Sequence, residues 1–253
     1  MKLGLVQSYI QWEDKQANQE KAQKKMEEAT RLGVDLLLFP EMSFTGFSME
    51  VERIGEEDGE TIEFLRKCAQ QYRMNIGAGW VERTGKKGKN HYTIVGRNGD
   101  ILLDYVKMHP FSYSGEDKYY EAGDGYEVVE VDGIPLTTFI CYDLRFPMSF
   151  WKASEKAHLI LLPANWPQRR IGQFKTLLQA RAIENQVYFA AINCVGDIHD
   201  ISYSGATCFI NPKGEVVAMV EDEETMLVVD MEDDVELQRK RFPVHQDRRR
   251  EER

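Results

Sequence analysis

The first eighty residues alternate between short apolar runs and longer amphipathic stretches, which predicts strands separated by helices. The expected strands cover residues 2–6, 34–39 and 75–80, and the expected helices cover residues 14–32 and 60–73. Residues 36–39 are all apolar, as expected of a strand covered on both faces, and the run stops at Pro40, which cannot donate a hydrogen bond to a sheet. This order predicts a β-α-β unit, with Glu41 directly after its buried second strand.

From residue 92 onward the pattern changes to short strands around two-residue turns. Asn98-Gly99 and Asp132-Gly133 each separate two apolar runs, which predicts β-hairpins whose antiparallel strands extend the sheet. Further helices are expected at 147–156 and 168–185, and further strands at 158–162, 187–193, 206–210, 215–220 and 225–230. Since no Pro/Gly/Ser-rich linker or internal repeat interrupts the series, residues 1–253 are expected to form a single α/β domain with more than one sheet layer.

Composition narrows the class of protein. The chain of 253 residues is 42% hydrophobic and 29% charged, which is typical of a globular domain rather than a disordered or fibrous one. Its 32 Lys+Arg and 42 Asp+Glu residues give a net charge of −10, so nucleic acid and anionic membrane surfaces are not expected partners. The amino terminus lacks a signal-peptide core, and no apolar run approaches the roughly 18 residues of a membrane span. We therefore expect a cytoplasmic protein.

Two basic triplets, at residues 239–241 and 248–250, lie in a charged C-terminal tail that covers residues 239–253. Basic triplets can bind nucleic acid, but acidic residues precede the first and interrupt the tail after the second, so the local charge is mixed. We expect a solvated or oligomer-contacting tail.

Four cysteines lie far apart, without a C-x-x-C pair or zinc-site spacing, which indicates free thiols in a reducing compartment. We expect three of them to be structural: Cys68, Cys194 and Cys208. Cys141 lies between a strand-like run and a helix begun by Pro147, a position that favours a thiolate and can direct backbone N–H groups at an oxyanion. A buried structural thiol is the alternative for Cys141.

A catalytic thiol, with an ordinary pKa of about 8.5, needs a base or a positive neighbour. His109 is the best of five histidines, although none has the sequence context of a Cys-His protease. Glu41 and Lys107 each end an apolar strand; helix capping and simple solvation are the alternatives for them. Because ligands of α/β folds bind beyond the strand ends, Glu41, Lys107 and Cys141 together predict one active site.

Three blocks around these residues resemble the catalytic blocks of the nitrilase superfamily of carbon–nitrogen hydrolases, in the family's order. They are residues 38–47 (LFPEMSFTGF), 105–111 (YVKMHPF) and 140–147 (ICYDLRFP). The likeness continues through residues 163–167, 180–185 and 205–215, so it covers nearly the whole chain. The resemblance implies a four-layer α-β-β-α sandwich, usually paired as a homodimer across one helical face, and chemistry without a metal or organic cofactor.

Carried over position by position, the resemblance implies that Cys141 is the nucleophile, Glu41 the general base and Lys107 the cation that stabilises the oxyanion. Glu116 matches the family's second active-site glutamate. Glu121, five residues later, aligns with a structural position in the same loop.

Residues 165–167 and the terminal segment around 242–247 most resemble bacterial omega-amidases, which hydrolyse the ω-amide of 2-oxoglutaramate and similar monoamides. In such members an arginine at the position of Arg145 grips the distal carboxylate of the substrate; a salt bridge within the fold is its alternative. Asn165 and Trp166 are expected to line the pocket, and the Tyr142 backbone N–H to bind the oxyanion. Since salt screens bulk charge beyond about 8 Å, Lys107 and Arg145 predict a positive pocket in an acidic protein.

The sequence therefore predicts an amidohydrolase that cleaves a small carboxylate-bearing amide through a cysteine thioester. Two alternatives remain open at this point. One is a different amidase or an N-carbamoyl hydrolase of the same superfamily, and the other is a non-catalytic binding member of the fold.

Overall fold

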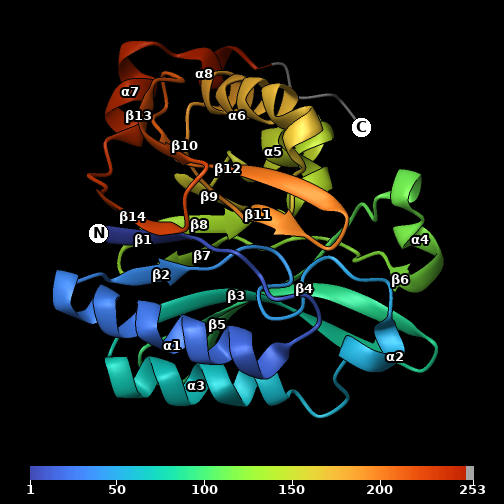
Figure 1. Ribbon diagram of the computed structural model, residues 1–253. Helices are drawn as coiled ribbons and strands as arrows, with labels where there is room; N and C mark the ends of the chain where they lie inside the picture. Colours follow the sequence, from blue (N-terminus) through green and yellow to red (C-terminus); the bar gives the residue numbers. More distant parts are fainter. Residues whose placement is uncertain (249–253) are drawn as a thin grey trace.

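The computed structural model describes residues 1–248 and consists of two β-sheets packed face to face, with helices on both outer faces (Figure 1). The first sheet contains β1 (Lys2–Gln7), β2 (Leu36–Leu38), β3 (Asn75–Thr84), β4 (Lys87–Val95), β5 (Ile101–Val106), β6 (Tyr120–Glu121) and β14 (Thr225–Asp230). Its strand order is β14-β1-β2-β3-β4-β5, with β6 beside β4.

The second sheet has the order β11-β12-β10-β9-β8-β7, with β13 beside β12. Its strands are β7 (Val129–Val131), β8 (Ile134–Thr138), β9 (Leu159–Ala164), β10 (Tyr188–Asn193), β11 (Val195–Ile198), β12 (Ile201–Ile210) and β13 (Val216–Glu221). In each sheet the central strands that flank a helical crossover run parallel, and hairpin strands are added antiparallel at the sides.

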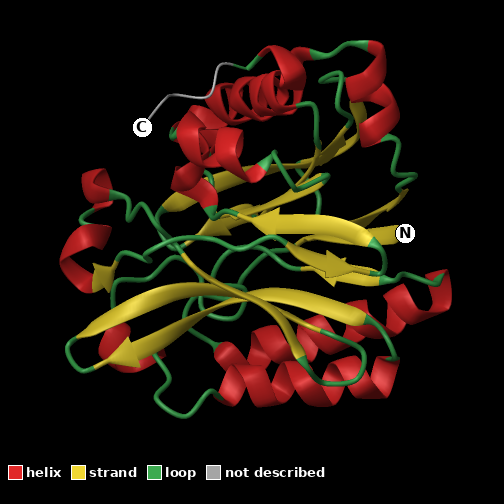
Figure 2. Ribbon diagram, turned by 180° about the vertical axis from the view of Figure 1, so that it is seen from behind, coloured by secondary structure: helices red, strands yellow, loops and turns green. Residues whose placement is uncertain are grey.

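The helices form the two outer layers (Figure 2). The first sheet is covered by α1 (Lys15–Leu32) and α3 (Glu60–Tyr72), and the second by α5 (Pro147–Ala153), α6 (Ile171–Asn185), α7 (Val235–Arg241) and α8 (Val244–Asp247). Short helical turns are α2 (Val51–Ile54), η1 (Ser112–Ser114), α4 (Glu116–Tyr119), η2 (Cys141–Arg145) and η3 (Gln168–Arg170). The predicted four-layer α-β-β-α sandwich is confirmed. Among the described residues, no helix is both long and apolar enough to cross a membrane.

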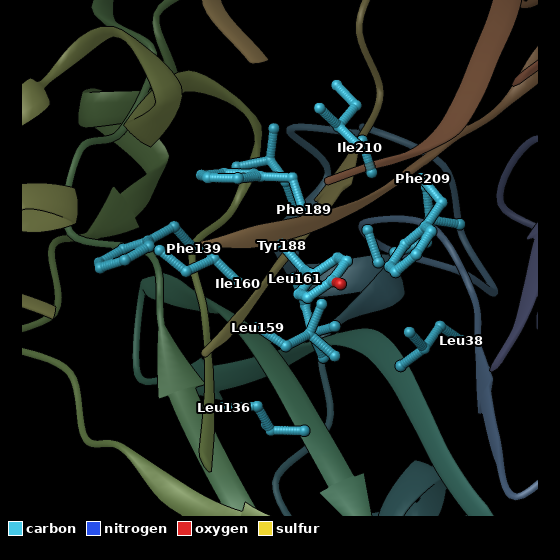
Figure 3. Packing of buried hydrophobic residues seen from close by; sticks show 14 of the residues in the cluster. Leu38, Leu136, Phe139, Leu159, Ile160, Leu161, Tyr188, Phe189, Phe209 and Ile210 are labelled. Carbon is cyan, nitrogen blue, oxygen red and sulfur yellow. The ribbon is translucent and has the colours of Figure 1, made fainter. Parts of the chain in front are cut away.

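The run of leucines in β2 shows why a strand between two layers has no polar face. Leu36 and Leu38 belong to the interior between the sheets, whereas Leu37 packs with α1 and α3 on the opposite face. Figure 3 shows Leu38 in the same buried cluster as Leu136 of β8 and Leu159 and Leu161 of β9 in the second sheet. Burying one such side chain contributes about 1.5–3 kcal/mol, so this interior fixes how the two sheets sit on each other.

The predicted hairpin at Asp132-Gly133 forms, but the prediction that it extends the first sheet is wrong. β7 and β8 pair with each other, and β8 continues the second sheet beside β9. The alternation of apolar and polar residues fixes which face of a strand is buried and not which sheet the strand joins. β3 and β4 are also longer than predicted, because their charged ends pair with each other as far as Thr84 and Lys87.

The prediction of a solvated tail is wrong for Arg239, which lies in α7 and is only 8% exposed. Its guanidinium donates hydrogen bonds to the carbonyls of Ser154 (2.8 Å) and Ala157 (3.3 Å), just past the end of α5. Arg248 likewise donates to the carbonyls of Trp151 (3.1 Å) and Glu184 (2.8 Å), in the last turns of α5 and α6. Both cations therefore meet the helix ends where carbonyls lack intrahelical partners and the helix dipole is negative. Residues 249–253 of the predicted tail lie outside the described residues.

We expect the change Arg239→Met to lower the free energy of unfolding by about 2 kcal/mol, because two carbonyls lose a charged donor inside the protein. Lys240→Met is the matched control, since Lys240 is an exposed neighbour in the same helix, and its effect should stay below about 0.5 kcal/mol. Urea unfolding followed by circular dichroism measures both. Equal losses in the two variants would show that Arg239 does not cap α5.

Candidate active site

The ends of three strands lie close together at one edge of the interface between the two sheets, which we call the seam. Glu41 follows β2 and Lys107 follows β5, both from the first sheet, whereas Cys141 follows β8 of the second sheet. Lys107 Nζ lies 2.8 Å from Glu41 Oε1, and Lys107 and Cys141 line the same cavity. The structure thus brings together the three residues whose positions at strand ends predicted a common site.

Lys107 is buried between two carboxylates. Its Nζ lies 3.0 Å from Glu116 Oε2 as well as 2.8 Å from Glu41 Oε1, and the three side chains are 1%, 0% and 0% exposed for Lys107, Glu41 and Glu116. Burial alone would lower the pKa of Lys107, but the charges of Glu116 and Glu41 outweigh it and raise that pKa well above its ordinary value. Burial raises the pKa of Glu116, and the charge of Glu41 adds to this while Lys107 opposes it. Lys107 is therefore a permanent cation, and Glu121 lies apart from it on the exposed side of β6.

Asn90, in β4, completes this cluster, and no feature of the sequence pointed to it. Its Nδ2 donates to Glu41 Oε1 (2.9 Å) and to Glu116 Oε1 (3.3 Å), and its carbonyl accepts from the backbone N–H of Lys107 (2.9 Å). A single asparagine within a polar stretch carries no periodic signal. Only the pairing of β4 with its neighbours shows that its side chain points at two carboxylates.

Glu41 is fixed from both sheets. The backbone N–H of Asn165, after β9, donates to Glu41 Oε2 (2.8 Å), and Asn165 Nδ2 donates to the Glu41 carbonyl (2.7 Å). Asn165 lines the cavity as predicted, but its backbone N–H and side-chain amide nitrogen bind Glu41. Gly79 lets the segment that contains Glu41 and Met42 lie close against β3, because a Cβ at position 79 would lie 2.3 Å from the Met42 backbone nitrogen. The carboxylate therefore has one orientation, set by contacts across the seam.

Cys141 sits on a sharp turn at the start of η2, with a left-handed φ of 45°. Such a conformation costs a non-glycine residue about 1–3 kcal/mol and persists only where the surroundings enforce it. Here Asp143 does so: its buried carboxylate accepts from the backbone N–H of Ile140 (2.9 Å) and from the hydroxyl of Tyr105 (2.7 Å). The turn presents Cys141 to the cavity in the manner of a nucleophile elbow.

The surroundings of Cys141 oppose the thiolate form that its position before a helix favours. Burial raises the pKa of the Cys141 thiol well above its ordinary value, and the charge of Glu41 raises it further, against the opposing effect of Lys107. The position at a helix start does not outweigh these effects. Cys141 is therefore a thiol at neutral pH and needs a base.

His109 is not that base. Its Nδ1 lies 2.7 Å from Asp143 Oδ1, and its ring stacks on Phe146 at 3.8 Å between centroids. It supports the turn that carries Cys141 and is not among the residues that line the cavity. The other three cysteines are buried and unpaired, as predicted.

The cavity beside Cys141 has a volume of about 760 Å³ and a wall rich in aromatic rings. Phe111, Tyr113, Tyr142 and Trp166 line it. Trp166 is held at both ends: its backbone N–H donates to Asn193 Oδ1 (2.8 Å) and its Nε1 to the carbonyl of Arg170 (3.0 Å). The rings give the cavity a fixed shape.

Cations surround the same cavity. Arg145, Arg169 and Arg170 line it, and within residues 1–248 none of the three has a carboxylate oxygen within 4.0 Å. The salt bridge considered for Arg145 is therefore not formed by the described residues; its Nη2 donates to Gln173 Oε1 (2.7 Å), and its guanidinium lies 5.0 Å from the centre of the Trp166 ring. Arg53 and Lys107 also line the cavity, as do Glu13 and Glu50, so cations outnumber carboxylates in its wall although the protein has a net charge of −10.

Comparison with known families agrees with this geometry. The family model described as "Carbon-nitrogen hydrolase" matches residues 2–240. This chain belongs to the carbon–nitrogen hydrolase family. The predicted membership of the nitrilase superfamily is thereby confirmed, and with it the class of enzyme, a hydrolase of carbon–nitrogen bonds.

Individual relatives of this hydrolase cover nearly its whole length. It is 36% identical to a 2-oxoglutaramate amidase of Bacillus subtilis strain 168, over 86% of each chain. It is 32% identical to the omega-amidase YafV of Escherichia coli K12, over 98% of this chain and 96% of that protein. The crystal structure of a CN-hydrolase superfamily protein from Xanthomonas campestris matches it with a TM-score of 0.93 at 29% identity, covering 99% of this chain and 97% of that one.

The change Lys107→Met in this hydrolase should leave two buried carboxylates without a cation and lower the free energy of unfolding by about 3–5 kcal/mol at pH 8. Burial raises the pKa of Glu116, and the loss of Lys107 removes the charge that opposes this rise, so the folded state of the variant holds the Glu116 proton more tightly than the unfolded state, where the pKa is about 4.3. Stability is then lost as the pH increases from the unfolded pKa to the folded pKa. The deficit relative to the unaltered protein should therefore shrink as the pH falls from about 8 to about 5.

Denaturant unfolding at several pH values measures this, with Lys118→Met, an exposed lysine of α4, as control. A deficit for Lys107→Met that stays constant over this pH range would mean that the carboxylates remain charged, contrary to the expectation.

Proposed function

We propose that this hydrolase releases ammonia from the ω-amide of a small carboxylate-bearing amide, with 2-oxoglutaramate as the leading substrate. The observation that carries the proposal is that Cys141 and the Lys107 cluster share one cavity with Arg145, which lacks a carboxylate partner in residues 1–248. The names of the two curated relatives, a 2-oxoglutaramate amidase and an omega-amidase, support the same substrate class.

In the first step, Cys141 Sγ attacks the amide carbonyl carbon while Glu41 accepts the thiol proton. Glu41 is suited to this because Asn165 and Lys107 fix both of its oxygens, and because the thiol keeps its proton until attack. Lys107 Nζ and the Tyr142 backbone N–H stabilise the tetrahedral oxyanion. When the carbon–nitrogen bond breaks, Glu41 returns the proton to the nitrogen, and ammonia leaves.

In the second step, water hydrolyses the thioester. Glu41 removes a proton from the water as its oxygen attacks the carbonyl, Lys107 again stabilises the oxyanion, and the proton passes to the departing Cys141 sulfur. The balance is one amide and one water consumed, and one carboxylic acid and one ammonia formed. Glu116 acts by holding Lys107 Nζ in place with two contacts, at 3.0 and 3.1 Å.

Arg145 is proposed to bind the distal carboxylate of the substrate. A guanidinium presents two parallel N–H groups to a carboxylate, and the contact with Gln173 leaves part of this fork free. Trp166 supports the guanidinium from one side. Neutral amides of the same length should therefore be poorer substrates than anionic ones.

The activity is tested by ammonia release from 2-oxoglutaramate, a neutral aliphatic amide, an aliphatic nitrile and an N-carbamoyl amino acid. We expect release from 2-oxoglutaramate and its loss in Cys141→Ala but not in Cys68→Ala, since Cys68 belongs to α3, is buried in the cluster between the first sheet and its helices, and does not line the cavity. Intact-mass analysis of the quenched reaction should find the acyl group on Cys141. Release from the N-carbamoyl compound alone would replace the proposal with the alternative superfamily activity.

We also propose that the enzyme is a cytoplasmic homodimer, paired across the outer face of α5 and α6. The support is the family resemblance together with two large apolar side chains on that face, Met148 of α5 (55% exposed) and Ile183 of α6 (53% exposed). The unpaired cysteines fit a reducing compartment.

For the dimer, we expect Ile183→Glu to halve the molar mass measured by size-exclusion chromatography with light scattering, because a charge would enter an apolar interface. Leu32→Glu, at an exposed apolar residue of α1 on the opposite layer, should leave the mass at that of a dimer. A dimeric mass for Ile183→Glu would place the interface elsewhere.

A further inference from the structure

The cavity wall contains more than one arginine that has no carboxylate oxygen within 4.0 Å among residues 1–248. Arg145, to which the distal carboxylate has been assigned, is accompanied by Arg170, from the start of α6. The two guanidiniums are linked along the wall by aromatic rings: Arg145 lies 5.9 Å from the centre of the Tyr142 ring, which lies 4.7 Å from the Phe111 ring, over which Arg170 lies at 5.2 Å. Arg145 therefore lies beside the ring of Tyr142, the residue that follows Cys141, and Arg170 lies beside the neighbouring ring of Phe111.

The surroundings of Arg170 disfavour its positive charge, and a bound anion would make them more favourable. Its side chain is half-buried, and burial lowers its pKa, as do the positive charges of Arg169 and Arg145. Arg170 and Cys141 line the same cavity. Within residues 1–248 no carboxylate oxygen lies within 4.0 Å of the Arg170 guanidinium. An anionic ligand in the cavity would relieve this repulsion.

The fold does not depend on the Arg170 side chain for its local structure. The contact that fixes Trp166 uses the Arg170 backbone carbonyl, which any residue provides. The Arg170 side chain itself contacts only one face of Phe111 among the aromatic rings. Its charge is thus available for a ligand.

We propose that Arg170 and Arg145 form a two-guanidinium subsite that selects amides whose distal carboxylate carries an acceptor oxygen on the adjacent carbon, as in a 2-oxo acid. One guanidinium fork satisfies the two oxygens of a carboxylate, and the third oxygen of a 2-oxo acid needs a further donor. Arg145 binds the carboxylate and Arg170 donates to the 2-oxo oxygen. This inference rests on the proposed function, and it makes Arg170 a specificity-determining residue.

The test compares 2-oxoglutaramate with glutaramate, which has the same length and lacks only the 2-oxo oxygen. The unaltered enzyme should prefer 2-oxoglutaramate in kcat/KM by at least about tenfold, the value of one charge-assisted hydrogen bond. Arg170→Gln should lower kcat/KM for 2-oxoglutaramate about 10- to 100-fold, chiefly through KM, and change glutaramate turnover much less, so that the preference collapses. Arg31→Gln, at an exposed residue of α1 that does not line the cavity, should change either value less than about twofold.

Binding to the Cys141→Ala variant gives a readout that does not depend on turnover. Calorimetric titration with 2-oxoglutaramate should show weaker binding when Arg170→Gln is added, and titration with glutaramate should show little change. An active enzyme whose Arg170→Gln variant keeps the same preference and the same binding ratio would overturn the subsite. An unaltered enzyme that releases no ammonia from either amide would instead overturn the proposed function.

Discussion

Lys107 enters the protein interior together with two carboxylates, and the rest of the site is arranged around that ion cluster. Removing charges from water costs several kcal/mol for each ion, and here Lys107, Glu41 and Glu116 offset one another with contacts of 2.8 to 3.1 Å. Asn90 supplies a further donor to both carboxylates. Burial raises the pKa of the neighbouring Cys141 thiol, and the charge of Glu41 in the cluster raises it further, so the thiol stays protonated. The base and the oxyanion-stabilising cation of the proposed reaction therefore stand in contact before substrate arrives.

The site also depends on the seam between the sheets. Glu41 and Lys107 belong to the first sheet, Cys141 and Asn165 to the second, and the hydrogen bonds from Asn165 to Glu41 join residues 124 positions apart. The leucine interior of Figure 3 sets the spacing of the sheets, and so the distance over which these groups meet. The packing of the two sheets is therefore needed to assemble the site, because each sheet alone carries only some of its residues.

Residues that end an apolar strand could be predicted from the sequence, because the change from apolar to polar residues is local. Glu41, Lys107 and Cys141 were found in this way, and the resemblance added Glu116. Asn90 and the burial of Arg239 could not be predicted, because an asparagine in a polar stretch and a basic triplet both look solvated until tertiary pairing is known. The raised pKa of the Cys141 thiol could not be predicted for a related reason: the helix start is a local signal, whereas burial and the charge of Glu41 depend on distant segments of the chain.

The pairing of β1 with β14 determines when the first sheet can be completed during protein synthesis. β1 lies between β2 and β14, and the amino group of Met1 donates to the carbonyl of Met231, a residue 230 positions later in the sequence. During synthesis at about 5–20 residues per second, one side of β1 stays unpaired for roughly 10 to 50 s. An unpaired strand edge is a template for pairing with other chains. This side of β1 therefore stays available for pairing with another chain until β14 has been synthesised.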